Sequence, residues 1–228
     1  MSTSTGANEL NQTLAEVADR RGRFIVVEGL DRAGKTTQCR LLAEALESPT
    51  NNVLQLRFPD RKTTIGCLLD AYLHKEVEIE EHAVHLLFSA NRYELKNAIE
   101  TALSQGRDVV CDRYTLSGIS YTFARRVVSN GHSLGLKDSF MTWAQEADKF
   151  LPIPDLTIML QISEKAAAKR QGFGKERFEQ TKFQNSVKDG MNYYWHNGWP
   201  SKQRLIVDGS KEIEAVHQCI LNAVKSIN

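Results

Sequence analysis

A glycine-rich stretch between residues 29 and 37 has the residue types and the spacing of a phosphate-binding loop. It fits the pattern G-x-x-x-x-G-K-[ST] at every position, follows an apolar run and precedes a helical pattern, as that motif requires. Backbone N–H groups of such a loop cradle the phosphates of a nucleotide at the start of the helix. Lys35 is then placed for the β- and γ-phosphates, and the Thr36 hydroxyl for Mg²⁺. The expected nucleotide-binding residues of this stretch are Gly29, Leu30, Asp31, Arg32, Ala33, Gly34, Lys35, Thr36 and Thr37.

Charged residues also stand at the ends of later apolar runs, where a second phosphate or a metal ion could bind. Arg57 comes near the end of one run, and a guanidinium fork suits a phosphate group. Asp112 and Arg113 end another, where a carboxylate suits Mg²⁺, directly or through water. The plainer alternatives are a surface charge at Arg57 and a strand-end salt bridge at Asp112 and Arg113.

Arg57 bears on the kind of acceptor that such a kinase would phosphorylate. A kinase acting on a nucleoside hydroxyl benefits from a nearby carboxylate base. A nucleoside monophosphate needs no such base, because its second phosphate pKa is about 6 and its oxygens are largely anionic near neutral pH. An arginine here therefore favours a monophosphate acceptor, although Asp60 lies close by and keeps a nucleoside acceptor open.

A phosphate loop alone does not separate kinases from GTPases or motor ATPases. The guanine-reading pattern N-K-x-D is absent from the chain, which weakens the GTPase hypothesis without eliminating it. Phe88 and Arg92 are four residues apart in the helical segment 80–101, so they share a face. An aromatic plane with a cation one turn away can stack on a base and hydrogen-bond its edge. From the residues alone, a plain core role for Phe88 is the favoured alternative.

Short apolar runs rich in Val, Ile and Leu alternate with segments of helical period. The runs are RFIVVE (23–28), VLQLRF (53–58), DVVCD (108–112), DLTIMLQI (155–162) and RLIVD (204–208). This alternation predicts an α/β fold with helices on both faces of a mostly parallel sheet, whose ligands lie beyond the carboxyl ends of the strands. No Pro/Gly/Ser-rich linker divides the chain, so we expect a flexible extension over residues 1–22 and a single P-loop domain over 23–228.

The composition limits the classes of partner. Hydrophobic residues make up 41% and charged residues 25% of the chain, and the formal net charge is +1, so nothing predicts nucleic-acid or membrane binding. Four widely spaced cysteines indicate reduced thiols. The first 22 residues lack an apolar signal core. We therefore expect a cytoplasmic protein, with a nuclear fraction left open.

Five motifs occur in an order that closely resembles the eukaryotic kind of thymidylate kinase, in the P-loop nucleoside monophosphate kinase superfamily. They are RFIVVEGLDRAGKTTQ, LRFPDRKTTIG, HLLFSANRYE, DRYTLSG and KRQGFGKERFE, and the likeness runs from about residue 23 to the C-terminus. It implies a three-layer α/β/α fold, a five-stranded parallel sheet and a short mobile lid. It also implies phosphorylation of dTMP to dTDP by ATP with Mg²⁺, in dTTP synthesis, and a homodimer through the helices around residues 80–102.

The resemblance assigns roles to matching residues. Asp31 would contact the deoxyribose 3′-hydroxyl, and Arg57 and Arg113 would clamp the acceptor phosphate. Phe88 would stack on thymine while Arg92 donates to a thymine oxygen. The implied dTMP site comprises Asp31, Arg57, Phe58, Phe88, Arg92, Arg113, Ser117, Gly118, Tyr121 and Phe178. The implied catalytic residues are Asp31, Arg32, Lys35 and Arg113, and the metal site is Thr36 with Asp112.

The same resemblance makes residues 164–183 the lid, whose own sequence is equally compatible with a mobile, solvated loop. Arg170 would lie against adenine, with the backbone around Ser210 and Lys211 as the other wall. Arg32 marks the chain as a kind in which the phosphate loop supplies an extra cation. Phe178 departs from the tyrosine usual in the family, which leaves the discrimination against ribonucleotides open. Another deoxynucleoside or deoxynucleotide kinase is the first alternative, and a nucleotide-binding regulatory switch is the second.

Overall fold

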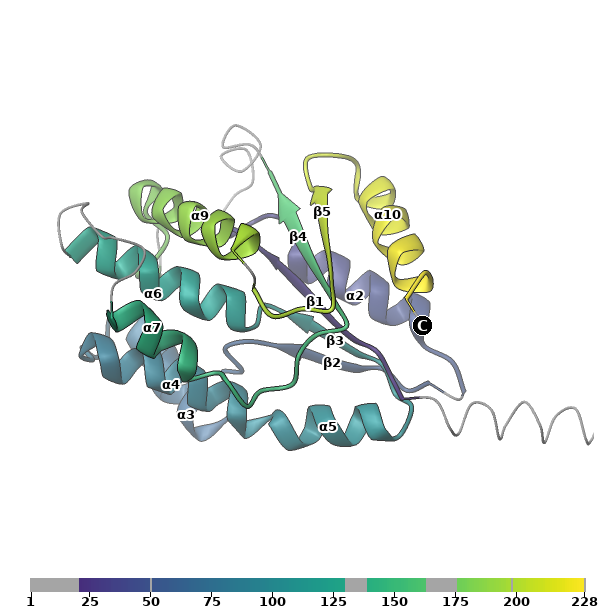
Figure 1. Cartoon of the computed structure of the whole chain (residues 1–228), viewed down its shortest axis with the longest axis horizontal. Helices are drawn as coiled ribbons and strands as arrows, with labels where there is room; N and C mark the ends of the chain where they lie inside the picture. Colours follow the sequence, from purple (N-terminus) through teal and green to yellow (C-terminus); the bar gives the residue numbers. More distant parts are fainter. Residues whose placement is uncertain (1–20, 50, 130–138, 163–175, 198, 228) are drawn as a thin grey trace, which may run out of the picture.

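The computed structural model describes residues 21–49, 51–129, 139–162, 176–197 and 199–227. Within them, parallel strands form one five-stranded sheet in the order β2-β3-β1-β4-β5 (Figure 1). The strands are β1 (Phe24–Gly29), β2 (Leu54–Arg57), β3 (Val109–Asp112), β4 (Leu156–Gln161) and β5 (Gln203–Asp208). The predicted α/β fold with a five-stranded parallel sheet is confirmed.

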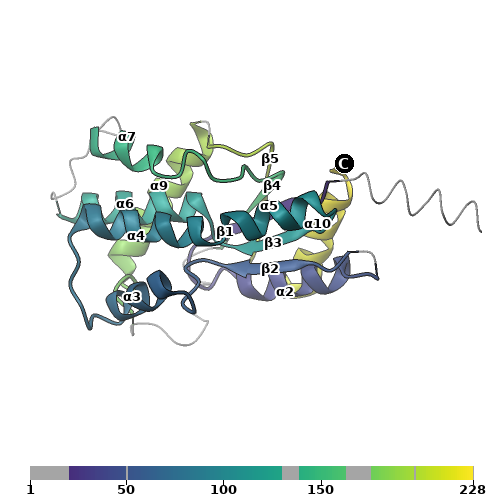
Figure 2. The same cartoon turned by 90° about the horizontal axis from the view of Figure 1, so that it is seen from below.

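Helices cover both faces of the sheet. They are α2 (Lys35–Leu46), α3 (Thr64–Leu73), α4 (Glu81–Glu94), α5 (Lys96–Ser104), α6 (Thr115–Ser129), α7 (Ser139–Glu146), α9 (Thr181–His196) and α10 (Ile213–Lys225). Helices α2 and α10 share one apolar core with strand residues such as Ile25, whereas α5 packs on the other face against Phe24 and Val26. Figure 2 shows α2 and α5 on opposite sides of the sheet. A further core joins α3, α4, α6, α7 and α9.

The central strands are apolar on both sides, which explains their continuous Val and Ile runs. Every residue of β1 and of β3 is buried. Their parallel register places Val27 opposite Asp112, and β2 places Arg57 opposite the same residue. The strands therefore end together, and the polar residues that follow them meet at one edge of the sheet.

The helix expected over residues 80–101 is two helices. Leu95 separates α4 from α5, with a backbone φ of −103°, and its N–H donates to the carbonyl oxygen of Arg92 at 3.2 Å. This i to i−3 bond makes a tight 3₁₀-type turn in place of an α-helical one. Phe88 and Arg92 both lie on α4, before the break.

Several sequence predictions fall outside the described residues, namely the extension up to residue 20, residues 164–175 of the expected lid, and Arg170. Residues 181–183 of that expected lid form the first turn of α9. Over the described part of the chain, no helix has the length and apolar character needed to cross a membrane.

Candidate active site

The phosphate loop joins β1 to α2 through a left-handed backbone. Gly29 has a φ of 144° and Gly34 a φ of 96°. A Cβ at position 29 would lie 2.5 Å from the carbonyl oxygen of Leu160, so only glycine fits there. Arg32 also has a left-handed φ, 67°, which is uncommon for a residue with a side chain. The loop thus accepts an unfavourable backbone conformation at its one arginine.

Lys35 is the first residue of α2 and is buried. Its Nζ donates to the carbonyl oxygen of Leu30 at 2.7 Å, inside the loop. Burial lowers the pKa of Lys35 to about 8, and the positive charge of Arg113 adds to that effect. Removing this ammonium group from water is costly, and a nucleotide phosphate beside it would supply the missing negative charge.

Thr36 and Asp112 meet across the edge of the sheet, and their oxygens fit a hard cation. The Thr36 hydroxyl donates to Asp112 Oδ2 at 2.6 Å, and the Nε of Arg57 lies 3.9 Å from the same oxygen. The other carboxylate oxygen, Asp112 Oδ1, is buried and has no hydrogen-bond partner among the described residues. A buried carboxylate oxygen without a donor is suited to Mg²⁺, which binds carboxylate and hydroxyl oxygens.

Asp31 accepts hydrogen bonds from three side chains, which come from different parts of the chain. Arg113 donates to Asp31 Oδ1 through Nη2, and to the hydroxyl of Ser117 at 3.1 Å through Nη1. The Tyr121 hydroxyl donates to Asp31 Oδ2 at 3.2 Å, and the Gln184 amide donates to it at 2.9 Å. Burial alone would raise the pKa of Asp31, but Arg113 and Lys35 together hold it below its usual value. Asp31 is therefore a carboxylate, an acceptor for a hydroxyl donor.

Glu28, at the end of β1, fixes the start of α6. This carboxylate is fully buried and accepts the backbone N–H groups of Tyr114 and Ser117, at 2.9 and 3.1 Å. It also accepts the Ser117 hydroxyl at 2.5 Å. A carboxylate at a helix N-terminus satisfies N–H groups that have no partner within the helix. The sequence motif predicts no such role for Glu28, because its partners lie 86 and 89 residues away.

A first cleft opens between α4, α6 and the carboxyl ends of the strands. It is lined by every residue of the dTMP site implied by resemblance: Asp31, Arg57, Phe58, Phe88, Arg92, Arg113, Ser117, Gly118, Tyr121 and Phe178. The structure thus brings together side chains from positions 31 to 178. Arg57 and Arg113 supply positive charge to this lining, and Phe88 and Arg92, one turn apart on α4, supply an aromatic ring and a further cation.

Aromatic rings close part of the first cleft. Phe178 is buried and stacks on Phe183, with ring centroids 4.7 Å apart and planes 13° apart. It also meets the ring of Tyr121 edge-on at 5.6 Å. At position 178 the ring therefore contributes apolar packing, and the polar contacts on this side come from the Tyr121 hydroxyl and the Gln184 amide.

A second cleft contains the phosphate loop. Its lining includes Asp31, Arg32, Ala33, Gly34, Lys35, Thr36, Thr37, Asp112 and Lys211. Gly29, Leu30 and Ser210 line a separate third cleft, so Ser210 and Lys211 face different spaces. Asp31, Arg57 and Arg113 line both the first and the second cleft. These three side chains stand where a ligand in one cleft would meet a ligand in the other.

Sequence reasoning missed several residues of the site. Gln184 holds Asp31 but lies 153 residues from it, and no local pattern reveals that contact. His85 lines the first cleft, one turn before Phe88 on α4, so helical periodicity could have indicated it. His85 Nε2 faces the carbonyl oxygen of Ala144 at 2.9 Å, and burial lowers the pKa of this imidazole.

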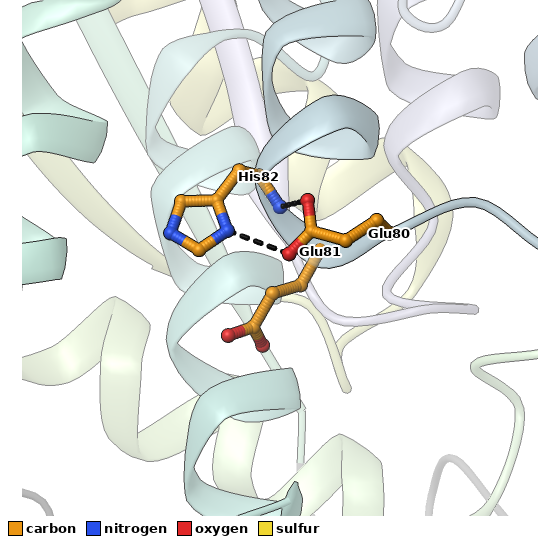
Figure 3. A group of neighbouring side chains, drawn as sticks. All are labelled: Glu80, Glu81 and His82. Atoms are coloured by element: carbon orange, nitrogen blue, oxygen red, sulfur yellow. Dashed lines mark hydrogen bonds and ion pairs between the residues drawn. The ribbon is translucent and has the colours of Figure 1, made fainter.

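Glu80, Glu81 and His82 form a separate group of possible metal ligands at the start of α4 (Figure 3). Glu80 caps the helix by accepting the backbone N–H groups of His82 and Ala83, and it pairs with the His82 ring at 2.6 Å. Glu81 pairs with Arg126 at 2.5 Å. These contacts account for the group as the start of a helix.

Comparisons with known proteins converge on one family. A family model described as thymidylate kinase matches residues 27–220. The chain is 44% identical to thymidylate kinase of Homo sapiens, over 90% of each chain. It is 39% identical to thymidylate kinase of Danio rerio, over 91% of this chain and 92% of the other. A solved structure of thymidylate kinase from Candida albicans matches with a TM-score of 0.78 and 36% identity, over 90% of this chain and 92% of that one.

Proposed function

The chain belongs to the thymidylate kinase family, and from this premise we propose that its first cleft binds dTMP while its second binds ATP. The activity is the ATP-dependent phosphorylation of dTMP to dTDP. One observation carries the assignment of the clefts: Asp31, Arg57 and Arg113 line both of them. Two guanidinium groups at the junction suit two phosphates that must approach each other.

The transfer joins an oxygen of the dTMP 5′-phosphate to the γ-phosphorus of ATP. The bond between that phosphorus and the oxygen bridging to the β-phosphate breaks, and ADP leaves with the bond electrons. No side chain has to remove a proton from the acceptor, since its phosphate is already largely ionised. The residues therefore act by positioning and by charge stabilisation.

Positively charged side chains would stabilise the transferred phosphoryl group and hold the acceptor phosphate. Lys35 would reach the β- and γ-phosphates, and its pKa, lowered to about 8 in the free protein, rises when a phosphate binds. Arg32, which also lines the second cleft, supplies a further positive charge as the phosphoryl group moves. Arg57 and Arg113 would hold the acceptor phosphate from the opposite side.

We further propose Mg²⁺ as the metal that accompanies ATP. The Thr36 hydroxyl and the buried Asp112 carboxylate would hold it, directly or through water. Bound there, the ion would neutralise charge on the β- and γ-phosphates.

The remaining groups of the first cleft would orient the nucleoside. The Asp31 carboxylate would accept the deoxyribose 3′-hydroxyl, the Phe88 ring would stack on the base, and Arg92 would donate to a carbonyl oxygen of thymine. We also propose a homodimer through α4, where Leu86 is 47% exposed. The four cysteines are free thiols, which supports a reducing, cytosolic compartment.

A coupled ADP-release assay across five acceptors tests the proposal. We expect turnover with dTMP to exceed turnover with dUMP, dGMP, AMP and thymidine. Faster turnover with thymidine would mean a nucleoside kinase, and ATP hydrolysis without any acceptor dependence would mean a nucleotide switch. Either result would contradict the assignment of the first cleft to a nucleoside monophosphate.

A further inference from the structure

A carboxylate that no sequence motif singles out holds Arg92. The Arg92 side chain is 3% exposed, and that of Asp148 is 8% exposed. Nη2 of Arg92 lies 2.9 and 2.7 Å from the two carboxylate oxygens, and Nε donates to one of them at 3.2 Å. Taking both charges out of water is costly, so the pair depends on these charge-assisted bonds and on their geometry.

Asp148 is itself fixed from the same helix. Ser89, three residues before Arg92 on α4, donates its hydroxyl to Asp148 Oδ1 at 2.6 Å, and that hydroxyl oxygen lies 3.0 Å from the carbonyl oxygen of Ala147. The segment that follows α7 thus docks on α4 at the position of the guanidinium. The carboxylate has little freedom to move, and neither does the cation that it holds.

The opposite side of the Arg92 guanidinium is covered by α6. A Cβ added to Gly118 would lie 2.8 Å from Nη2 and 2.9 Å from Nη1 of Arg92, so the backbone of α6 lies directly against the group. Nη1 makes no hydrogen bond with any described residue, and Arg92 lines the first cleft. Two elements therefore fix the guanidinium while its Nη1 keeps the capacity to donate.

We propose that Asp148 is a positioning residue that sets the base specificity of the first cleft by fixing Arg92. This inference rests on the proposed function, in which Arg92 donates to thymine. A fixed N–H donor matches a carbonyl oxygen at position 4 of a pyrimidine. It opposes an amino group there, because two donors then face each other without an acceptor. A guanidinium free to turn aside would lose that discrimination.

Asp148 also neutralises one of the arginines that line the first cleft. Its carboxylate balances the charge of Arg92, just as Asp31 pairs with Arg113 where the first cleft meets the second. Without Asp148, the uncompensated charge of Arg92 would compete for the phosphate.

The test replaces Asp148 by its uncharged isostere and compares two pyrimidine acceptors. In Asp148→Asn, we expect the ratio of kcat/KM for dTMP to kcat/KM for dCMP to fall about tenfold, or about 1.4 kcal/mol. KM for dTMP should rise, while kcat at saturating dTMP stays within about twofold and KM for ATP is unchanged. A purely structural role would lower kcat/KM for both acceptors by the same factor.

Asp108→Asn is the matched control, because Asp108 also forms a buried pair with an arginine, Arg23, with side chains 4% and 12% exposed. We expect it to lower stability and to leave the dTMP to dCMP ratio unchanged. Ser89→Ala is a milder second variant that removes one hydrogen bond to Asp148 and should lower the ratio about twofold to threefold.

The outcomes separate this inference from the function on which it rests. A wild-type protein that does not phosphorylate dTMP would overturn both. If the wild type phosphorylates dTMP but Asp148→Asn and Ser89→Ala keep its discrimination against dCMP, the inference alone is overturned. Should Asp148→Asn fail to fold, the ratio measured for Ser89→Ala decides in the same way.

Discussion

The two edges of the sheet use the same kinds of charged residue in opposite ways. At the amino edge, Arg23, Asp108 and Asp155 directly precede β1, β3 and β4. Asp108 accepts from Arg23 at 2.5 Å and 3.1 Å, and Asp155 accepts from Lys202 at 2.6 Å. Both oxygens of each carboxylate have donors. Among the described residues, every carboxylate oxygen of Asp108 and Asp155 is therefore paired with a donor, and these pairs stabilise the fold at the amino edge.

The carboxyl edge differs from the amino edge in how its buried charged groups are paired. Asp112 is as buried as Asp108, yet its Oδ1 has no donor among the described residues. Lys35 is buried with a pKa lowered to about 8. Since the lowered pKa means that the folded protein disfavours the protonated lysine, this residue costs stability at neutral pH. Both edges carry buried charged residues. The carboxyl edge is distinguished by a carboxylate oxygen without a donor among the described residues and by a lysine whose protonated form is disfavoured.

The largest effect is expected from the loop arginine of the carboxyl edge. Arg32→Ala should lower kcat on the order of 10³-fold, because it removes a cation that balances charge on the transferred group. KM for ATP should change much less, since the loop backbone and Lys35 still bind the phosphates. Steady-state kinetics with dTMP as acceptor measure both. An unchanged kcat would show that Arg32 has no part in the transfer.

The control for that variant is Arg40→Ala. Arg40 lies on α2, is 55% exposed, and pairs with Glu44 at 2.7 Å. Its loss should leave kcat and KM unchanged, because surface ion pairs of this kind contribute little. A similar fall in kcat in both variants would mean that net charge, and not the position of Arg32, governs the rate.

The order and register of the strands explain why the sequence predicts the fold, and why it predicts which residues gather at the carboxyl edge. Each apolar run identified a strand, and parallel strands bring their carboxyl ends together, so local motifs at those ends predict a shared cleft. The contacts that orient these motifs were not predictable. Asp148 is 56 residues from Arg92, and Gln184 is 153 residues from Asp31. Such pairs depend on how helices dock, which hydrophobic periodicity does not specify.

The helix break at Leu95 is not predictable from the sequence, for a related reason. No Pro or Gly interrupts the stretch from Glu81 to Ser104, so its composition indicates one helix. The helix instead breaks at Leu95, and α5 packs Ile99 and Leu103 against the sheet. Tyr93 and Leu95 pack against the same core as Ile99, whereas Val84, at the other end of α4, lies in the core with α6 and α9.

At the amino edge we expect a change in stability without a change in activity. Asp155 accepts from Arg21 and from the backbone N–H of Phe24, at 2.6 and 2.7 Å, in addition to Lys202. Asp155→Asn should lower the free energy of unfolding by about 2 kcal/mol, on the scale of hydrogen bonds to a charged group. Urea denaturation at pH 7 measures it, and kcat and KM should not change. A loss of activity in the folded variant would contradict the separation of the two edges.

The pH dependence of that effect has a definite sign. Burial alone would raise the pKa of Asp155, but Lys202, the Phe24 N–H and Arg21 bring it below 3.8. Its stabilisation is therefore present above the unfolded pKa and is lost as the pH falls through the lower, folded pKa. The difference between wild type and Asp155→Asn should shrink below about pH 4. Glu44→Gln, at an exposed pair, should differ from wild type by less than about 0.5 kcal/mol throughout.

The smallest effect is expected in the pH dependence of kcat/KM for ATP, which depends on the protonation of Lys35 at the carboxyl edge. Because the pKa of Lys35 in the free protein is about 8, kcat/KM for ATP should fall as the pH rises above that value, by roughly tenfold one pH unit higher. At saturating ATP, kcat should stay level to higher pH, since the bound phosphates favour the ammonium form. Lys35→Arg should lose activity but keep a flat kcat/KM profile, as a guanidinium stays protonated throughout this range. If kcat/KM for ATP falls with pH in Lys35→Arg as it does in the wild type, a group other than Lys35 is responsible for the pH dependence.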